Sequence, residues 1–142
     1  MSDSISYEEY LKQNGSMTYT NVGISMLPLL RQGKDLFIVR KKEAERCKVG
    51  DIVLYRRDKQ YVLHRVVEVR EADYVILGDN CIKREVGITD DDIIGVMTGF
   101  VRGGKEYSVS DPGYLLYSAV WLHTEKPRIF LKRGCAWLRR HL

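Results

Sequence analysis

Gly23-Ile24-Ser25-Met26-Leu27-Pro28 separates two runs of strand-forming residues in this chain of 142 residues. Met17-Thr18-Tyr19-Thr20 precedes it and Leu36-Phe37-Ile38-Val39 follows it, and both runs are rich in the residues that strands favour. Glycine leaves the backbone free before Ser25, whereas proline fixes it after Ser25. The stretch therefore predicts a loop between two strands that presents one serine, either as a turn residue or as an exposed nucleophile.

A second segment supplies residues that can activate such a serine. His64 lies within the strand-like run Tyr61-Val62-Leu63-His64-Arg65-Val66-Val67-Glu68-Val69. The next such run, Tyr74-Val75-Ile76-Leu77, ends at the turn Gly78-Asp79-Asn80. A serine hydroxyl needs a base to accept its proton, and a histidine with a pKa of ~6.5 does so near neutral pH. Ser25, His64 and Asp79 therefore supply a nucleophile, a base and a carboxylate, although a solvated strand histidine has the same pattern.

The chain resembles the signal peptidase and LexA-like clan of serine peptidases over residues 17–100. The resemblance lies in an ordered set of short blocks: Gly23 to Pro28, Gly50-Asp51-Ile52-Val53, His64-Arg65-Val66-Val67, Gly78-Asp79-Asn80 and, more weakly, Ile93-Ile94-Gly95-Val96-Met97. The base in this clan is usually lysine, but the endoplasmic-reticulum, archaeal and some spore-former signal peptidases have histidine. His64 places the chain nearest this Ser-His branch.

The resemblance implies roles for three residues. Ser25 would be the nucleophile, His64 the general base, and Asp79 the acidic partner that holds the other ring nitrogen. The backbone N–H of Ser25 is the expected oxyanion donor. Gly23 stands where some bacterial relatives have a serine hydroxyl, so it supplies no second donor.

A second acidic residue follows Gly-Asp-Asn in histidine-type relatives. The candidates in this chain are Glu85 and the run Asp90-Asp91-Asp92. Each of them has the alternative of an ordinary solvated loop position. The acid that orients His64 therefore stays open among Asp79, Glu85 and Asp90 to Asp92.

The expected fold class is mainly β, a signal-peptidase/LexA-like catalytic β domain with a short N-terminal helix and a helical C-terminal tail. In the N-terminal segment, residues 1–16, Ser6-Tyr7-Glu8-Glu9 matches a capping box and predicts a helix from Tyr7 to Gln13. Residues 17–110 form the expected β domain. Its strands are predicted at 17–20, 36–40, 52–55, 61–70, 74–77, 93–102 and 106–109, with a polar loop over 81–92.

Residues 111–142 form the expected basic tail. Tyr114 to Leu122 predicts a short apolar helix, Lys126-Pro127 interrupts it, and Ile129 to Leu142 resumes as an amphipathic segment. The stretch from Trp121 to Leu142 carries +5, whereas the whole chain carries +4. Such a tail is expected to contact an anionic membrane surface or a partner, or to pack on the domain. Nucleic acid is not an expected partner, because no recognition motif accompanies the charge.

The composition favours a cytoplasmic protein without cofactors. The chain lacks the basic start and apolar run of a secretory signal, and no stretch offers the ~20 apolar residues of a transmembrane helix. Three cysteines, Cys47, Cys81 and Cys135, leave one unpaired in any disulfide scheme, which favours a reducing compartment. The histidines and cysteines have no zinc-site spacing, so no metal is expected. The expected location is the cytoplasm, including the inner membrane face.

The expected function is that of a serine endopeptidase that cleaves signal- or leader-like peptides by a Ser-His(-Asp) mechanism. One alternative is a non-catalytic peptide-binding or maturation-accessory module that retains the fold. A second is a LexA-like self-cleaving regulator, which would need a DNA-binding domain and a cleavable segment upstream. The first alanine, Ala44, lies beyond Ser25 and weakens that alternative. The presence of Ser25, His64 and Asp79 together favours the peptidase.

Overall fold

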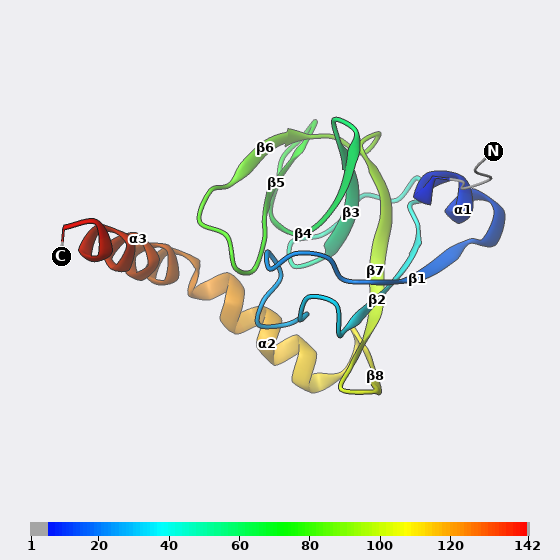
Figure 1. Ribbon diagram of the computed structural model, residues 1–142. Coiled ribbons are helices and arrows are strands. Elements are labelled where there is room, and N and C mark those ends of the chain that lie inside the picture. The colour runs from blue at the N-terminus through cyan, green and yellow to red at the C-terminus, as the bar shows by residue number, and fades with distance from the viewer. Residues whose placement is uncertain (1–5, 142) are drawn as a thin grey trace.

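The computed structural model of the protein describes residues 6–141 and has a mainly β architecture. One antiparallel sheet of eight strands follows helix α1 and precedes helices α2 and α3, which confirms the expected fold class (Figure 1). The strands are β1 (Ser16–Thr20), β2 (Leu36–Lys41), β3 (Ile52–Arg57), β4 (Gln60–Val69), β5 (Tyr74–Leu77), β6 (Glu85–Ile88), β7 (Ile93–Arg102) and β8 (Lys105–Ser108). The helices are α1 (Tyr7–Asn14), α2 (Pro112–His123) and α3 (Glu125–His141).

The sheet is curled rather than flat. Its strands lie in the order β1-β2-β7-β3-β4-β5-β6, and β8 pairs with the end of β7. The register shifts between Ile38 and Val39 in β2 and between Leu54 and Tyr55 in β3, both against β7. Such shifts bend strands and increase their twist, which agrees with the curl that Figure 1 shows.

The curled sheet separates two hydrophobic clusters. One cluster joins α1, the serine loop and the strands beneath them through residues such as Leu11, Met26 and Phe37. The other lies among β3, β4, β5 and β7 and includes Val66 and Ile76. Met26, next to Ser25, is 1% exposed. The serine loop is therefore held by the core, although the serine itself is only half-buried.

Strand β4 carries buried residues on both of its faces at the middle of its length. Leu63 belongs to the first cluster and Val66 to the second, as the period-2 alternation of a strand requires. His64 is 7% exposed and Arg65 is 1% exposed. Both polar side chains are thus covered by protein, and each has hydrogen-bond partners from other segments of the chain.

Helix α1 forms where the capping box predicts it. The Ser6 side chain accepts a hydrogen bond from the Glu9 backbone N–H at 3.1 Å. Gly15 ends the helix with a φ of 81°, a left-handed conformation that glycine adopts without strain. Leu11 faces the core and is 1% exposed. This apolar contact docks α1 against the sheet.

The two C-terminal helices differ from the sequence prediction at their junction. The break falls at Thr124, the residue after the end of α2, and α3 begins at Glu125 rather than at Ile129. Pro127 does not interrupt a helix, because it lies in the first turn of α3, where a missing N–H costs no intrahelical bond. No helix within residues 6–141 is both long and apolar enough to cross a membrane.

Strand β6 is absent from the sequence prediction, which assigns residues 81–92 to a polar loop. It pairs with β5 through Tyr74 opposite Ile88 and Ile76 opposite Glu85. The strand is only four residues long, and Gly87 interrupts its pattern with a φ of 80°. Tertiary pairing with β5 therefore overrides a weak local signal.

Candidate functional site

The loop that carries Ser25 is fastened to the turn Gly78-Asp79-Asn80. The Asn80 backbone N–H donates to the Ser25 carbonyl at 2.8 Å, and the Asn80 side chain donates to the Ile24 carbonyl at 3.0 Å. The Asp79 N–H points at the Met26 sulfur at 3.4 Å. Two of the sequence blocks that lie far apart in the chain are thus in direct contact.

Gly78 marks the place where the serine loop, the turn and the histidine ring meet. A Cβ atom on Gly78 would lie 2.8 Å from the Ser25 carbonyl oxygen and 2.9 Å from His64 Cδ2. It would also lie 2.7 Å from the sulfur of Cys81. All three distances are shorter than a carbon atom tolerates, so only glycine fits here. The His64 ring and the backbone of Ser25 are consequently near neighbours.

His64 is tied through a tyrosine to a carboxylate. The Tyr55 hydroxyl donates to Glu85 Oε1 at 2.6 Å and lies 3.1 Å from His64 Nδ1. A tyrosine hydroxyl has one proton, and Tyr55 uses it in the hydrogen bond to Glu85. The proton in the hydrogen bond between Tyr55 and His64 therefore belongs to Nδ1 of the histidine. This tautomer leaves Nε2 of His64 unprotonated and able to accept a proton.

The surroundings of His64 keep its ring neutral. Burial and, to a lesser extent, the positive charge of Arg57 lower its pKa to about 4, against the opposing effects of the Glu85 and Asp79 carboxylates. Arg57 Nη1 also contacts Glu85 Oε1 at 3.1 Å, which partly compensates that carboxylate. At neutral pH the imidazole is therefore available as a base.

Asp79 does not contact His64 in the described structure. Its carboxylate forms a two-bond pair with Arg65, with Nε–Oδ1 and Nη2–Oδ2 distances of 2.8 and 2.9 Å, and accepts a bond from the Tyr117 hydroxyl at 2.7 Å. This geometry does not match the expectation that Asp79 holds the second nitrogen of His64. Asp79 is the buried acid that joins β4 to α2. The carboxylate that is connected to His64, through Tyr55, is Glu85 instead.

Arg65 extends the same buried network. Its Nη1 atom donates to the Gly50 carbonyl at 3.0 Å and to the Ser118 hydroxyl at 2.7 Å. A buried guanidinium needs such partners, because an unpaired charge is costly in the protein interior. The Gly50 and Gly78 blocks of the sequence are thereby linked by one side chain.

The other acidic candidates lie elsewhere. Asp90 accepts a hydrogen bond from the Tyr74 hydroxyl at 2.6 Å and pairs with Arg46. Asp92 accepts from the backbone N–H of Thr89 at 2.9 Å. Among the four alternatives in residues 85–92, only Glu85 is joined to the histidine, through Tyr55.

Tyr55 is the residue of this arrangement that the sequence reading misses. Val53 of β3 lies opposite His64, and Tyr55 lies opposite Val62. Tyr55 and His64 therefore share a face of the sheet as diagonal neighbours. Predicted strands that end at Tyr55 and resume at Tyr61 would pair these two residues and leave Tyr55 on the face opposite His64. In the structure the strands continue to Arg57 and Gln60, which pair with each other, and this shift of register brings Tyr55 to the histidine's side.

Ser25 and His64 line one cleft of about 1370 Å³. One wall is the start of β4, from Gln60 to His64, and residues 80–85 form another. Helix α3 contributes a third wall through Leu131, Lys132, Cys135, Ala136 and Arg139. Among residues 6–141 no hydrogen bond joins the Ser25 hydroxyl to His64, and the Ser25 backbone N–H donates none. That N–H is therefore available to a ligand.

The start of β4 has an open edge beside the cleft. Residues Gln60 to Arg65 pair with β3 on one side, whereas β5 pairs only with the part of β4 from Arg65 to Val69 on the other. Within the described chain no strand covers the second edge of residues 60–64. Its backbone groups can therefore pair with an extended peptide.

The C-terminal helices are bound to the same turn that holds Ser25. Trp121 Nε1 donates to the Asp79 carbonyl at 2.8 Å, and Arg128 Nη1 reaches the same oxygen at 3.2 Å. Lys132 Nζ donates to the Asn80 carbonyl at 2.7 Å. These contacts fix the start of α3 next to the cleft, and the rest of the helix extends away from the sheet (Figure 1).

Comparison of the chain with protein-family models, with curated proteins and with solved structures gives no match. Among residues 6–141, no group of three or more His, Cys, Asp and Glu side chains is arranged to hold a metal ion.

Proposed function

We propose that the chain is a serine endopeptidase of signal-peptidase-like type that cleaves signal- or leader-like peptides. One observation carries the proposal: Ser25 and a neutral His64 line the same cleft, and the Tyr55–Glu85 pair leaves Nε2 of the histidine unprotonated. A nucleophile, a base and an acid that orients the base are the parts that serine hydrolysis requires.

In this mechanism the Ser25 hydroxyl oxygen attacks the carbonyl carbon of the cleaved peptide bond while its proton passes to His64 Nε2. The negative oxygen that forms is stabilised by the Ser25 backbone N–H. The positive imidazolium is stabilised by Glu85 through Tyr55. His64 then protonates the leaving amine, and a water molecule, activated by His64, hydrolyses the acyl-enzyme and restores the serine.

The substrate is proposed to bind in an extended form along the open edge of β4. Residues 60–64 supply unpaired backbone groups next to His64, so strand addition places a peptide bond close to the reacting side chains. The same residues line the cleft with Ser25. Small side chains beside the cleaved bond are the preference that the resemblance implies.

The proposed place of action is the cytoplasm, with peripheral contact at the inner membrane face through α3. Phe130 and Trp137 are seven residues apart and therefore lie on the same face of α3. Phe130 is 76% exposed and Trp137 is 52% exposed. Arg133 and Arg140 lie beside them and are also exposed. An exposed helix face with tryptophan and arginine suits an anionic lipid surface.

A second candidate is a peptide-binding module without catalysis. It is favoured by the missing hydrogen bond between the Ser25 hydroxyl and His64 within residues 6–141. Catalytic hydrogen bonds are often long before substrate binds, so the peptidase is compatible with the same geometry.

The proposal is tested by incubating the protein with a pool of leader-like peptides and analysing the products by mass spectrometry. Wild type, Ser25→Ala and His64→Gln are compared, with circular dichroism to verify folding. We expect wild type to cleave and both variants to lose at least about a thousandfold in rate. If none of the three proteins cleaves a peptide but all of them bind peptide, the non-catalytic binding module would be established instead.

A further inference from the structure

We infer that the cleft selects peptides that carry acidic side chains near the cleaved bond. The inference rests on the proposed function, because it assigns a substrate class to the same cleft. It comes from the charges on the cleft walls, to which both the body of the chain and α3 contribute. The body of the chain before Trp121 carries a net charge of −1, whereas the cleft is lined mainly by cations.

Five cationic side chains and one carboxylate line the cleft. The cations are Arg57, Lys83, Arg84, Lys132 and Arg139, and the carboxylate is Glu85. Glu85 is engaged by the Tyr55 hydroxyl and by Arg57. The single negative group of the cleft is therefore occupied and does not neutralise the remaining cations.

Some of these cations are paired with a carboxylate of the protein, and others are not. Arg84 pairs with Glu125 at 2.6 Å and reaches Glu68 at 3.6 Å. Lys132 donates to carbonyl oxygens of Asn80, which are neutral acceptors. Lys83 and Arg139 are exposed and have no carboxylate partner among residues 6–141. Lys83, Lys132 and Arg139 thus present net positive charge to a ligand in the cleft.

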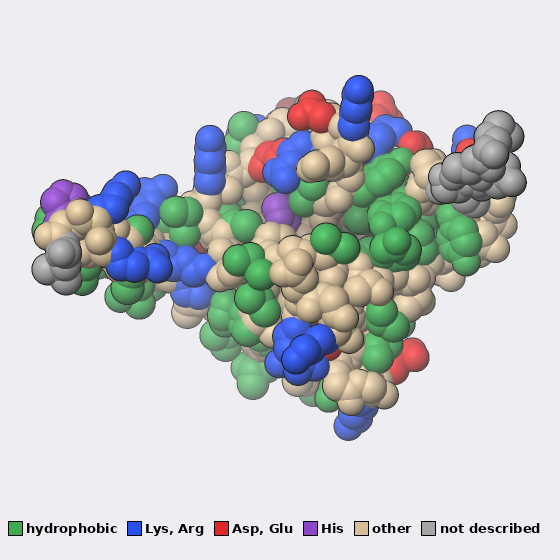
Figure 2. All heavy atoms as spheres, in the orientation of Figure 1, with side chains coloured by type: hydrophobic (Ala, Val, Ile, Leu, Met, Phe, Trp, Pro, Cys, Tyr) green, Lys and Arg blue, Asp and Glu red, His purple; other side chains and the backbone are tan. Residues whose placement is uncertain are grey.

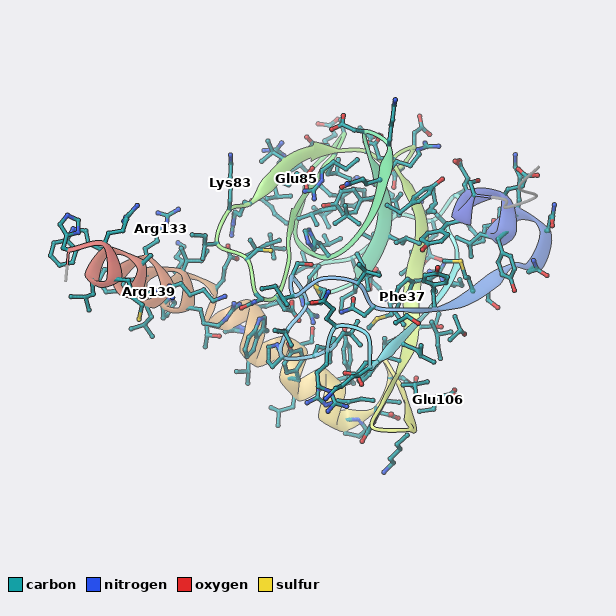
Figure 3. The ribbon with its side chains drawn as sticks, viewed as in Figure 1. Phe37, Lys83, Glu85, Glu106, Arg133 and Arg139 are labelled. Carbon is teal, nitrogen blue, oxygen red and sulfur yellow. The ribbon has the colours of Figure 1, made fainter. Side chains whose placement is uncertain are left out.

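Helix geometry separates the arginines of α3. Lys132 and Arg139 are seven residues apart and face the cleft together with Cys135. Arg133 and Arg140 lie on the next face, outside the cleft lining. Figure 2 shows Lys and Arg side chains gathered along α3, and Figure 3 labels Arg133 and Arg139 on this helix and Lys83 on the segment before β6. The cleft-facing and outward-facing charges can therefore be changed separately.

An extended peptide is the ligand that fits these walls. The open edge of β4 offers backbone groups, and α3 offers Leu131, Lys132 and Arg139 across the same cleft. Carboxylates on the peptide gain the attraction of Lys83 and Arg139, whereas lysines at the same positions are repelled. Charge thereby discriminates among peptides that have the same backbone contacts.

The test uses full-length Ser25→Ala protein and three fluorescein-labelled 12-residue peptides, measured by fluorescence anisotropy at pH 7.5. The peptides share a central Ala-Ser-Ala segment and carry Glu, Gln or Lys in their flanks. We expect the Glu peptide to bind about tenfold more tightly than the Lys peptide at 150 mM salt, with the Gln peptide between them, because two partly exposed ion pairs each contribute a few-fold. The preference should grow at 50 mM salt.

Charge reversal provides the decisive variant. Lys83→Glu/Arg139→Glu in the Ser25→Ala background should invert the order, so that the Lys peptide binds more tightly than the Glu peptide. The control Arg133→Glu/Arg140→Glu changes the net charge equally, outside the cleft lining, and should keep the original order. Equal binding of the three peptides, or inversion by the control pair to the same extent, would overturn the inference.

Cleavage assays separate this inference from the proposed function. Wild-type cleavage of all three peptides at equal rates would leave the peptidase intact and remove the charge preference. Charge-dependent binding without cleavage would preserve the inference for a binding module and remove the peptidase. Failure of all three peptides to bind or to be cleaved would contradict both.

Discussion

His64 Nδ1 lies 3.1 Å from the hydroxyl oxygen of Tyr55, and this contact connects the histidine to Glu85 rather than to Asp79. The tyrosine donates its only proton to Glu85 at 2.6 Å, so it accepts one from the imidazole. The Glu85 carboxylate is therefore linked to the histidine through an intervening side chain. Asp79, the acid within the turn Gly78-Asp79-Asn80, is instead paired with Arg65.

Tyr55→Phe tests this relay. The variant keeps the ring and removes the hydroxyl, so His64 loses the acceptor that selects its tautomer. We expect kcat/KM for a cleaved peptide to fall about 10- to 100-fold, with an unchanged far-ultraviolet circular dichroism spectrum. Tyr74→Phe is the matched control, since Tyr74 is equally buried and donates to Asp90, away from the cleft. Equal losses in both variants would speak against the relay.

The pH dependence of kcat/KM tests the state of His64. The base must be unprotonated, and its pKa is lowered to about 4. Activity should therefore rise as the pH increases through about 4 and stay level from pH 6 to pH 7.5, rather than rise near 6.5 as for an exposed histidine. An acidic limb near pH 6.5 would contradict the buried, neutral base.

Arg57→Ala should move that acidic limb to higher pH. Arg57 lowers the pKa of His64, so removing its charge raises the pKa. Arg56→Ala provides the control, because Arg56 pairs with Glu8 of the N-terminal helix region and does not line the cleft. The same shift in both variants would mean that overall charge, not the local contact, sets the limb.

Burial of His64 also predicts a pH dependence of folding. The pKa of the unfolded histidine is ~6.5 and that of the folded one is about 4, so between these values the unfolded state binds more protons. The stability that the neutral, buried His64 contributes to the folded state is fully present above pH 6.5 and is lost as the pH falls through 4. Relative to His64→Gln, wild type should lose roughly 3 kcal/mol in its free energy of unfolding between pH 7 and pH 4. Urea unfolding of both proteins at the two pH values measures this difference, and parallel curves would refute it.

Gly78→Ala tests the junction of the serine loop and the histidine. The added methyl would overlap the Ser25 carbonyl and the His64 ring, so it should push them apart. We expect cleavage to fall by at least about tenfold, since small displacements of reacting groups are costly. Gly134→Ala in α3 meets nothing within 4 Å and should leave activity unchanged. Full activity of Gly78→Ala would show that the junction tolerates movement.

Asp79→Ala should act on stability through Arg65. The substitution removes the carboxylate partner of Arg65, which is only 1% exposed. Because a buried charge without a partner is costly, we expect a loss of about 3–5 kcal/mol in the free energy of unfolding. Asp73→Ala removes the partner of the exposed Arg70 and should change stability little. Chemical denaturation measures both. A stable Asp79→Ala protein with an altered pH profile of activity would indicate that Asp79 is the acid that acts on His64.

Local patterns in the sequence determined much of the sheet and the first helix. Short runs of apolar and β-branched residues mark β3, β4 and β7, and the Ser6 capping box marks α1. These signals arise from neighbouring residues along the chain, so they need no tertiary contact. The same reasoning marked Ser25 and His64 as candidate site residues.

Only the tertiary structure decided which groups meet. Glu85 comes to the histidine because β6 pairs with β5, and a four-residue strand interrupted by Gly87 has almost no local signal. Asp79 goes to Arg65 because α2 encloses both, and a buried guanidinium requires a buried carboxylate. The sequence names the charged residues, but burial and the geometry of distant segments choose their partners.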